Sequence, residues 1–328
     1  MDTLSHDPAQ SSPRIAVLMG GTSSERPVSL SSGGAALTAL KAKGYDAHAI
    51  DVGPDIAATI TALRHLAPNV VFNALHGPGG EDGRIQGVLD WLSLRYTHSG
   101  VLASAIAMDK AATRVALEAA GLPIAKGCVI SPTQLYEADP LPRPYVVKPV
   151  AEGSSVGVHI VRPGDNRRQA IAENWSFGDR ILAEDFIPGR ELTVAVLNDT
   201  PLAVTEILPQ EAEGFYDFEA KYNAGGSRHL IPAPLPDAIT QQALMLASQA
   251  HQALGCRGAS RTDFRYDEHR HRLIILEVNT QPGMTPTSLL PEQAAWRGMD
   301  YPTLCHWMVE DALHDQPYPV QPFLKDSP

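Results

Sequence analysis

The first hundred residues alternate between two hydrophobic periodicities. Short apolar runs at 14–19, 46–52 and 70–74 predict buried strands of a parallel sheet, and amphipathic patterns at 28–43 and 56–66 predict the helices between them. Strands that alternate with helices over short connections are typical of an α/β domain with helices on both faces of its sheet. Ligands of such domains bind beyond the carboxyl ends of the strands.

Two glycine-rich segments, at 20–26 and 76–83, follow predicted strands at that edge. They carry Glu25 and His76, an acid and an imidazole that would project from neighbouring strand ends. Neither segment matches a dinucleotide-binding fingerprint, and the sequence contains no Walker A motif. Glycine-rich turns between strands and helices are also common without a ligand, so a plain turn and a binding loop both fit these segments taken alone.

After residue 100 the pattern changes to helices mixed with antiparallel strands, which is typical of an α+β region. Helices are predicted at 109–120, 165–177 and 237–254. Strands are predicted at 144–149, at 158–161, from 181 to the turn at Pro188-Gly189, from 191 onward, at 260–266 and at 272–279. Changes of pattern divide the chain into three predicted domains, 14–100, 101–188 and 189–328. Residues 1–13 are polar and are predicted to be a disordered lead-in.

One apolar run near the C-terminus, at 273–276, ends in polar residues. Glu277 and Asn279 are two positions apart, so in a strand they point to the same face. Asp263, on the preceding predicted strand, can reach that face. Oxygen ligands at the end of a buried strand suit a hard cation such as Mg²⁺. The turn at 282–283 can leave backbone N–H groups exposed beside such a cation.

Two lysines stand at positions where a cation is unfavourable without a partner. Lys110 lies in the first turn of a predicted helix, against the helix dipole, and Lys148 follows three apolar residues of a strand. Both positions suggest an anionic contact, although a solvated surface lysine also fits Lys110. The strand of Lys148 leads into a hydroxyl-rich hairpin at 152–157, whose backbone N–H groups can lie over phosphates. A plain hairpin turn is the alternative there.

Two further segments are candidates for contacts with a nucleotide. Residues 184–187 end a strand before the turn at 188–189, which predicts a hinge and a purine-binding edge, although the segment alone is only a turn. Residues 209–230 lack periodicity but contain several aromatic residues and Lys221. A long loop of this kind inside a compact domain is more often a lid than a random insertion.

Composition narrows the classes of function. The 328-residue chain has a formal net charge of −11, which argues against nucleic acid or an anionic membrane as the main partner. Cys128, Cys256 and Cys305 lie far apart without metal-ligand spacing, so reduced, buried thiols are predicted. The N-terminus lacks the pattern of a signal peptide, and no apolar run is long enough to span a bilayer, which predicts a cytoplasmic protein.

Several separated motifs can be compared with a known family. They read Gly-Gly-Thr-Ser-Ser-Glu-Arg at 20–26, Leu-His-Gly-Pro-Gly-Gly-Glu-Asp-Gly at 75–83, Glu-Gly-Ser-Ser-Val-Gly at 152–157 and Glu-Val-Asn-Thr-Gln-Pro-Gly-Met-Thr at 277–285. With these motifs in this order, the chain resembles the D-alanine–D-alanine ligases of the ATP-grasp superfamily. The resemblance implies an N-terminal α/β domain followed by two α+β domains that clamp ATP. It also implies a homodimer that joins two D-alanines through D-alanyl phosphate and so supplies a peptidoglycan precursor.

The resemblance further implies a role for each candidate residue. Lys110, Lys148 and Lys221 would contact the ATP phosphates, while Glu184, Asp185, Phe186, Ile187 and Glu191 would hold adenine and ribose. Asp263, Glu277 and Asn279 would bind two Mg²⁺ ions, which Mn²⁺ can replace. Glu25 would pair with the ammonium of the first D-alanine beside His76, and Ser154 and Tyr222 would join Glu25 in closing the lid. Arg261 and the backbone N–H of Gly283 would form an oxyanion hole, and Ser288 would receive the carboxylate of the second D-alanine.

Two other functions fit the same sequence. A ligase of the same fold could add D-lactate or another second substrate, although Tyr222 favours an amine nucleophile. A catalytically inactive binding protein could also use this scaffold. Such a protein would have no need of the complete charge set of Lys148, Arg261, Asp263, Glu277 and Asn279.

Overall fold

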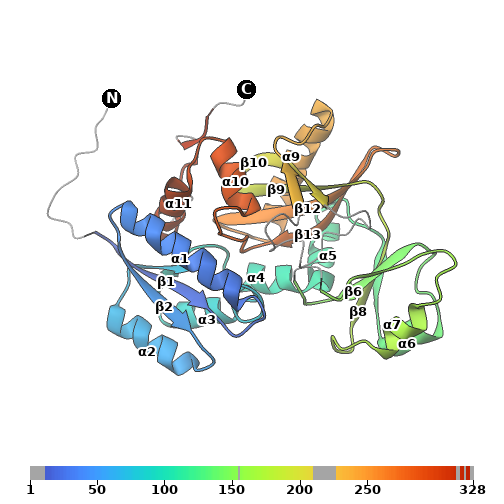
Figure 1. Cartoon of the computed structure of the whole chain (residues 1–328), viewed down its shortest axis with the longest axis horizontal. Coiled ribbons are helices and arrows are strands. Elements are labelled where there is room, and N and C mark those ends of the chain that lie inside the picture. The colour runs from blue at the N-terminus through green and yellow to red at the C-terminus, as the bar shows by residue number, and fades with distance from the viewer. Residues whose placement is uncertain (1–11, 154–155, 210–226, 315–317, 321–322, 326–328) are drawn as a thin grey trace.

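The computed structural model describes residues 12–153, 156–209, 227–314, 318–320 and 323–325, and it contains three sheets in this part of the chain. Figure 1 shows the N-terminal sheet at the left, the C-terminal sheet at the upper centre and the central sheet at the right. The first sheet falls within 14–96, the second within 127–185 and the third within 190–279. The predicted lead-in at 1–13 lies outside the described residues except for its last two positions.

The N-terminal sheet is parallel and has the strand order β2-β1-β3-β4. Its strands are β1 (Arg14–Gly20), β2 (Asp46–Val52), β3 (Val70–Asn73) and β4 (Arg95–Tyr96), and its helices are α1 (Arg26–Ala42), α2 (Ile56–Leu66) and α3 (Arg84–Trp91). Alternate residues of β1 enter separate cores, Ile15 with Leu40 of α1 and Ala16 with Leu63 of α2. The predicted strands and helices of this region are confirmed; α3 and β4 were not predicted.

The C-terminal helix α11 (Tyr301–Leu313) completes the core of the N-terminal sheet. Trp307 is fully buried in the cluster that contains Ile15 and Leu40. At the edge of this contact the hydroxyl of Tyr45 donates to Oε1 of Glu310 at 2.5 Å. The two ends of the described chain therefore pack together, an arrangement that the sequence pattern did not predict.

The packing of α11 gives a stability prediction. Trp307→Ala should lower the free energy of unfolding by about 3–5 kcal/mol, because a large fully buried side chain leaves a cavity. Trp91→Ala is the matched control: that side chain is 92% exposed, and its loss should change the free energy by less than about 0.5 kcal/mol. Urea unfolding of both variants measures the difference, and equal effects would contradict the assignment of α11 to this core.

The central sheet is antiparallel, with the order β5-β8-β6-β7. It comprises β5 (Gly127–Ile130), β6 (Tyr145–Pro149), β7 (His159–Val161) and β8 (Ile181–Asp185), with α6 (Pro132–Glu137) and α7 (Arg168–Glu173). The helix predicted at 165–177 is shorter than expected, because Asp165 forms a turn in which its carboxylate accepts from the N–H of Arg167 at 2.8 Å. The prediction of buried thiols is wrong for Cys128, which is exposed on the edge strand β5.

The C-terminal sheet is antiparallel, with the order β11-β10-β9-β12-β13. Its strands are β9 (Arg190–Leu197), β10 (Thr200–Pro209), β11 (Ser227–Leu230), β12 (Ala259–Asp267) and β13 (Arg272–Asn279). Helices α9 (Asp237–Ala253) and α5 (Lys110–Ala119) share a core with one face, while α10 (Leu289–Trp296) contacts β9 and β10. Helix α4 (Val101–Met108) lies against β13. Helices α4 and α5 thus pack on the C-terminal sheet.

The loop predicted at 209–230 is shorter at both ends. Pro209 belongs to β10, and residues 227–230 form β11, which pairs with β10. Residues 210–226 lie outside the described part of the chain, so the prediction of a lid there stays untested. Within the described residues, no helix is both long enough and apolar enough to span a membrane.

Candidate active site

Two adjoining pockets lie between the three sheets. The first is lined by residues of the N-terminal loops, of β12 and β13 and of the turn before α10, including Glu25, His76, Arg261, Asn279, Gly283 and Ser288. The second is lined by residues of β6, β8, β12 and β13, including Lys148, Glu184, Asp185, Phe186, Ile187, Glu191 and Asp263. Lys110, Glu152 and Glu277 line both, so the pockets meet at these residues.

The paired strands β12 and β13 place the predicted metal ligands side by side. Asp263 lies opposite Glu277, and Arg261 lies opposite Asn279. The carboxylate of Asp263 accepts from Arg261 Nε at 2.9 Å and Nη2 at 2.8 Å, and from Thr193 Oγ1 at 2.6 Å. In the described residues no three His, Cys, Asp or Glu side chains gather as a metal site. Two carboxylates and the amide oxygen of Asn279 are nevertheless a donor set that fits Mg²⁺.

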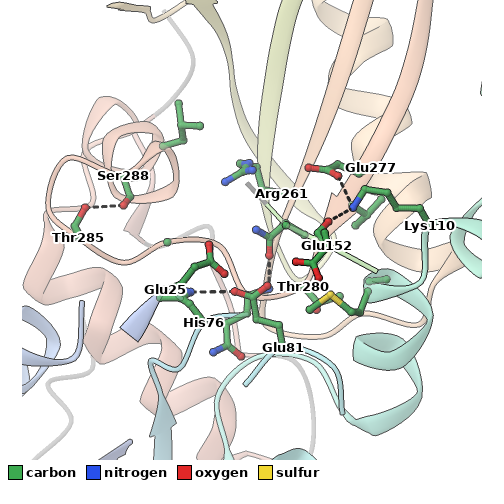
Figure 2. A pocket seen from close by; sticks show the side chains of 18 of the residues that line it. Glu25, His76, Glu81, Lys110, Glu152, Arg261, Glu277, Thr280, Thr285 and Ser288 are labelled. Atoms are coloured by element: carbon green, nitrogen blue, oxygen red, sulfur yellow. Dashed lines mark hydrogen bonds and ion pairs between the residues drawn. The ribbon is translucent and has the colours of Figure 1, made fainter. Parts of the chain in front are cut away.

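Lys110 lines both pockets, and Figure 2 shows its ammonium between Glu277 and Glu152. As the first residue of α5 it was predicted to contact an anion, and its Nζ atom lies 3.3 Å from Oε2 of Glu277. The same ammonium donates to the carbonyl oxygen of Glu152 at 2.6 Å. The ammonium is therefore held at the junction of the pockets, next to a predicted metal ligand.

Lys148 is buried, as its place in an apolar strand predicted, and it has a carboxylate partner. Its Nζ atom lies 2.5 Å from Oε2 of Glu184, whose other oxygen lies 2.7 Å from Nη1 of Arg114. Arg114 also donates to the carbonyl oxygen of Ala125 at 2.7 Å. Glu184 thus pairs with two cations, Lys148 and Arg114. Arg114 was not predicted, although it stands four residues after Lys110 on the same helix face, where a second cation can be inferred.

The end of β8 and the start of β9 form the wall of the second pocket. Phe186 and Ile187 line it together with Glu191, whose Oε2 lies 3.6 Å from Nη2 of Arg265. The guanidinium of Arg162 lies over the ring of Phe186, 5.6 Å from its centroid. These apolar and backbone groups beside a carboxylate suit a flat base with an attached ribose.

The N-terminal loops bring Glu25 and His76 together. His76 Nδ1 lies 3.1 Å from Oε1 of Glu81, and Nε2 lies 3.3 Å from Oγ of Ser32. Gly77 has a φ of +71°, and a Cβ atom there would lie 2.7 Å from Oε2 of Glu25. Glycine at this position therefore permits the close approach of the two loops that Figure 2 shows.

His98 is a second buried histidine of the N-terminal region, and it lines neither pocket. Burial lowers the pKa of His98 to about 3, and the charge of His76 acts in the same direction. His98 is therefore neutral at physiological pH, packed edge-on against Phe72. By contrast, His76 and His229 both line the first pocket.

The turn after β13 reaches the N-terminus of α10. Ser288 is the N-cap residue of this helix, and its hydroxyl lies 2.7 Å from that of Thr285. A Cβ atom on Gly283 would lie 3.0 Å from Oγ of Ser288, so the backbone of Gly283 and the helix start are close neighbours. The predicted oxyanion donor Gly283 and the predicted carboxylate-binding residue Ser288 are therefore neighbours in the lining of the first pocket. Figure 2 shows Ser288 beside Thr285 there.

The chain is similar over most of its length to proteins of known family. Residues 117–310 match the family model described as D-ala D-ala ligase C-terminus. A D-alanine–D-alanine ligase of Gluconobacter oxydans (strain 621H) is 69% identical over 300 residues, which cover 92% of this chain and 99% of the relative. A D-alanine–D-alanine ligase of Granulibacter bethesdensis is 62% identical over 303 residues, which cover 91% and 97%. The chain belongs to the D-alanine–D-alanine ligase family.

Solved structures agree with this family assignment. A crystal structure of D-alanine–D-alanine ligase from Bacillus anthracis has a TM-score of 0.80 at 30% identity, and one complexed with ATP has a TM-score of 0.78 at 26% identity. Each comparison covers 92% of this chain and 98% of the other. The predicted ATP-grasp architecture, with α/β and α+β parts, is confirmed.

Most of the residues that the D-alanine–D-alanine ligase resemblance selected line one of the two pockets, but three lie outside the described residues: Ser154, Lys221 and Tyr222. Sequence reasoning also missed contacts that hold the site together. Gln281 accepts from Nδ2 of Asn73 at 2.7 Å and its own amide donates to the carbonyl oxygen of Leu75, which fixes the β13 turn to the N-terminal loops. The sequence does show that Gln281 is a polar residue between Asn279 and Gly283, but it does not indicate which residues the side chain contacts.

Proposed function

We propose that the chain joins two D-alanines with ATP, through D-alanyl phosphate, to give D-alanyl-D-alanine, ADP and phosphate in the cytoplasm. The observation that carries this proposal is that the two pockets meet at Lys110 and Glu277. A nucleotide in the second pocket would present its phosphates to a substrate carboxylate in the first. The names of the relatives and the ATP complex of the Bacillus anthracis ligase support it.

The first half of the reaction has to convert a carboxylate, which is a poor electrophile, into an acyl phosphate. Lys110 and Lys148 supply positive charge for the phosphates, and Phe186, Ile187 and Glu191 hold the nucleoside so that the terminal phosphate points to the junction. Mg²⁺ bound by Asp263, Glu277 and Asn279 would neutralise further charge on the phosphates. Glu25, beside His76, would bind the ammonium of the first D-alanine and so orient its carboxylate.

The second half of the reaction is attack by the amine of a second D-alanine on the acyl carbon. The tetrahedral intermediate carries a negative oxygen, which Arg261 and the N–H of Gly283 would stabilise. Ser288, at the start of α10, would bind the carboxylate of the attacking D-alanine. Because water would hydrolyse the acyl phosphate, the proposal includes a lid within 210–226 with Lys221 and Tyr222, which would close together with Ser154.

The organisation of the whole protein is also part of the proposal. The three domains 14–100, 101–188 and 189–328 would move relative to one another as ATP binds, and the protein would act as a homodimer that supplies a peptidoglycan precursor. One sheet lies in each of the three ranges, which supports this division. Helices at the boundaries depart from it, because α4 and α5 pack on the C-terminal sheet and α11 packs on the N-terminal sheet. Analytical ultracentrifugation of the purified chain tests the dimer, and a single monomeric species would overturn it.

The proposed function is tested by phosphate release in the presence of ATP and Mg²⁺. The substrates are D-alanine, L-alanine, and D-alanine mixed with D-lactate, and products are identified by mass. We expect phosphate and D-alanyl-D-alanine with D-alanine and no release with L-alanine alone. A depsipeptide as the main product would assign the chain to the D-lactate-using ligases instead. Nucleotide binding without any product would identify an inactive binding protein.

A further inference from the structure

A second histidine lines the first pocket, and none of the roles above uses it. His229 lies in β11, opposite Ile207 of β10, and its side chain is 16% exposed. Its Nδ1 atom lies 2.8 Å from Oε2 of Glu292, whose side chain is 35% exposed. The first pocket therefore contains an imidazole that is held by a carboxylate.

The carboxylate belongs to the helix that begins at the proposed site for the second D-alanine. Glu292 is in the first turn of α10, and its backbone N–H donates to the carbonyl oxygen of Ser288 at 3.0 Å. His229 is thus attached to the same helical turn as Ser288. One carbon atom separates the carboxylate from the ammonium in an α-amino acid. An amino acid whose carboxylate binds at Ser288 must therefore place its ammonium among the side chains that surround this turn.

The ammonium of the second D-alanine has no lone pair and cannot attack the acyl phosphate until a base removes one proton. An imidazole that donates its Nδ1–H to a carboxylate carries its lone pair on Nε2, and the carboxylate stabilises the imidazolium that forms when Nε2 is protonated. The contact between His229 and Glu292 has the atoms for this arrangement.

We propose that His229, oriented by Glu292, is this base; the inference rests on the proposed function. The ammonium gives one proton to Nε2 of His229, and the resulting amine forms a C–N bond with the acyl carbon. The C–O bond to phosphorus-bound oxygen breaks, and its electron pair stays with the phosphate. The nitrogen gives a second proton to that phosphate, which leaves as HPO₄²⁻, and His229 returns its proton to solvent.

The other ionisable residues that line the pocket are Glu25, His76, Glu81, Lys110, Glu152, Arg261 and Glu277. Lys110 and Glu277 form an ion pair. His76 is likewise held by a carboxylate, that of Glu81, but it belongs to the N-terminal loops beside Glu25 rather than to the turn of Ser288. An arginine such as Arg261 has no lone pair with which to accept a proton at neutral pH. Glu25 is assigned to the ammonium of the first substrate. His229 is distinguished from these groups by its connection to the helical turn of Ser288.

Hydroxylamine separates the proposed step from the rest of the reaction. It is largely unprotonated at neutral pH, so it attacks an acyl phosphate without a base. In His229→Gln, formation of D-alanyl-D-alanine should fall by about 10²-fold, the lower end of what a general base contributes. Formation of D-alanyl hydroxamate from ATP, D-alanine and hydroxylamine should be unchanged. The dipeptide rate of the variant should also rise with pH, because more of the acceptor is then a free amine.

Two further variants complete the experiment. Glu292→Gln keeps the side-chain shape but removes the charge, and it should lower dipeptide formation less than His229→Gln, again without loss of hydroxamate. His48→Gln is the matched control, since His48 Nε2 contacts Oδ1 of Asp46 at 2.6 Å on the exposed strand β2; it should leave both rates unchanged. Equal loss of dipeptide and hydroxamate in His229→Gln, or no loss of either, would overturn the assignment. Absence of hydroxamate in the wild type would instead contradict the proposed function.

Discussion

Arg261→Ala is expected to lower the turnover number by two to three orders of magnitude, while binding of the nucleotide persists. Arg261 and Gly283 both line the first pocket, where the tetrahedral oxyanion would form, and Arg261 does not line the second pocket, in which we propose that the nucleotide binds. Loss of one preorganised oxyanion donor costs about 3–4 kcal/mol in other enzymes. Because the oxyanion forms only after phosphorylation, the affinity for ATP should change little. Steady-state phosphate release and calorimetric titration with ATP measure the two quantities.

Arg261 also makes two contacts with Asp263, so the loss could arise through the metal site instead. The Mg²⁺ concentration that gives half-maximal turnover distinguishes these causes, and it should remain close to the wild-type value if the oxyanion role is correct. Arg272→Ala removes an exposed guanidinium from the other end of β13 and serves as the control. Wild-type turnover in Arg261→Ala would remove this residue from the mechanism.

Glu277→Gln should produce a loss of similar size for a different reason. Glu277 lines both pockets and contacts Lys110 at 3.3 Å, and as a proposed metal ligand it would help to neutralise the phosphates. A bound metal contributes several kcal/mol to such a step, so we expect turnover to fall by about 10³-fold. We also expect the variant to need more Mg²⁺ for its remaining activity, because glutamine has no negative charge.

A matched control for that variant is Glu173→Gln, an exposed carboxylate at the end of α7, which should have no effect. Mn²⁺ binding to the two proteins in the presence of ADP, followed by electron paramagnetic resonance, gives a readout that does not depend on turnover. Unchanged Mn²⁺ affinity in Glu277→Gln would show that Glu277 is not a ligand.

The centre of the site could be predicted from the sequence because it depends on local regularities. The period of two in a strand places Glu277 and Asn279 on one face, and antiparallel pairing with a short turn brings Asp263 opposite Glu277. Lys148 could be expected to need an anion because it stands in an apolar strand. In each case a few neighbouring residues contain the information.

The partners of these residues could not be predicted, because they depend on contacts between distant segments. Arg114 meets Glu184 seventy positions later in the chain, and Gln281 reaches back to Asn73. His229 and Glu292 come from different elements, and no local pattern pairs a histidine at a strand edge with a carboxylate in a helix. Likewise, the amphipathic character of α11 indicates a buried face but does not say which sheet covers it.

The most direct test of the central claim is to follow the carboxylate oxygens of D-alanine. If ATP phosphorylates the carboxylate at the junction of the two pockets, one of its oxygens becomes the bridging oxygen of D-alanyl phosphate and leaves with the phosphate. With D-alanine labelled with ¹⁸O in its carboxylate, mass spectrometry should detect ¹⁸O in the phosphate that is released together with D-alanyl-D-alanine. Dipeptide formation with unlabelled phosphate would contradict the account.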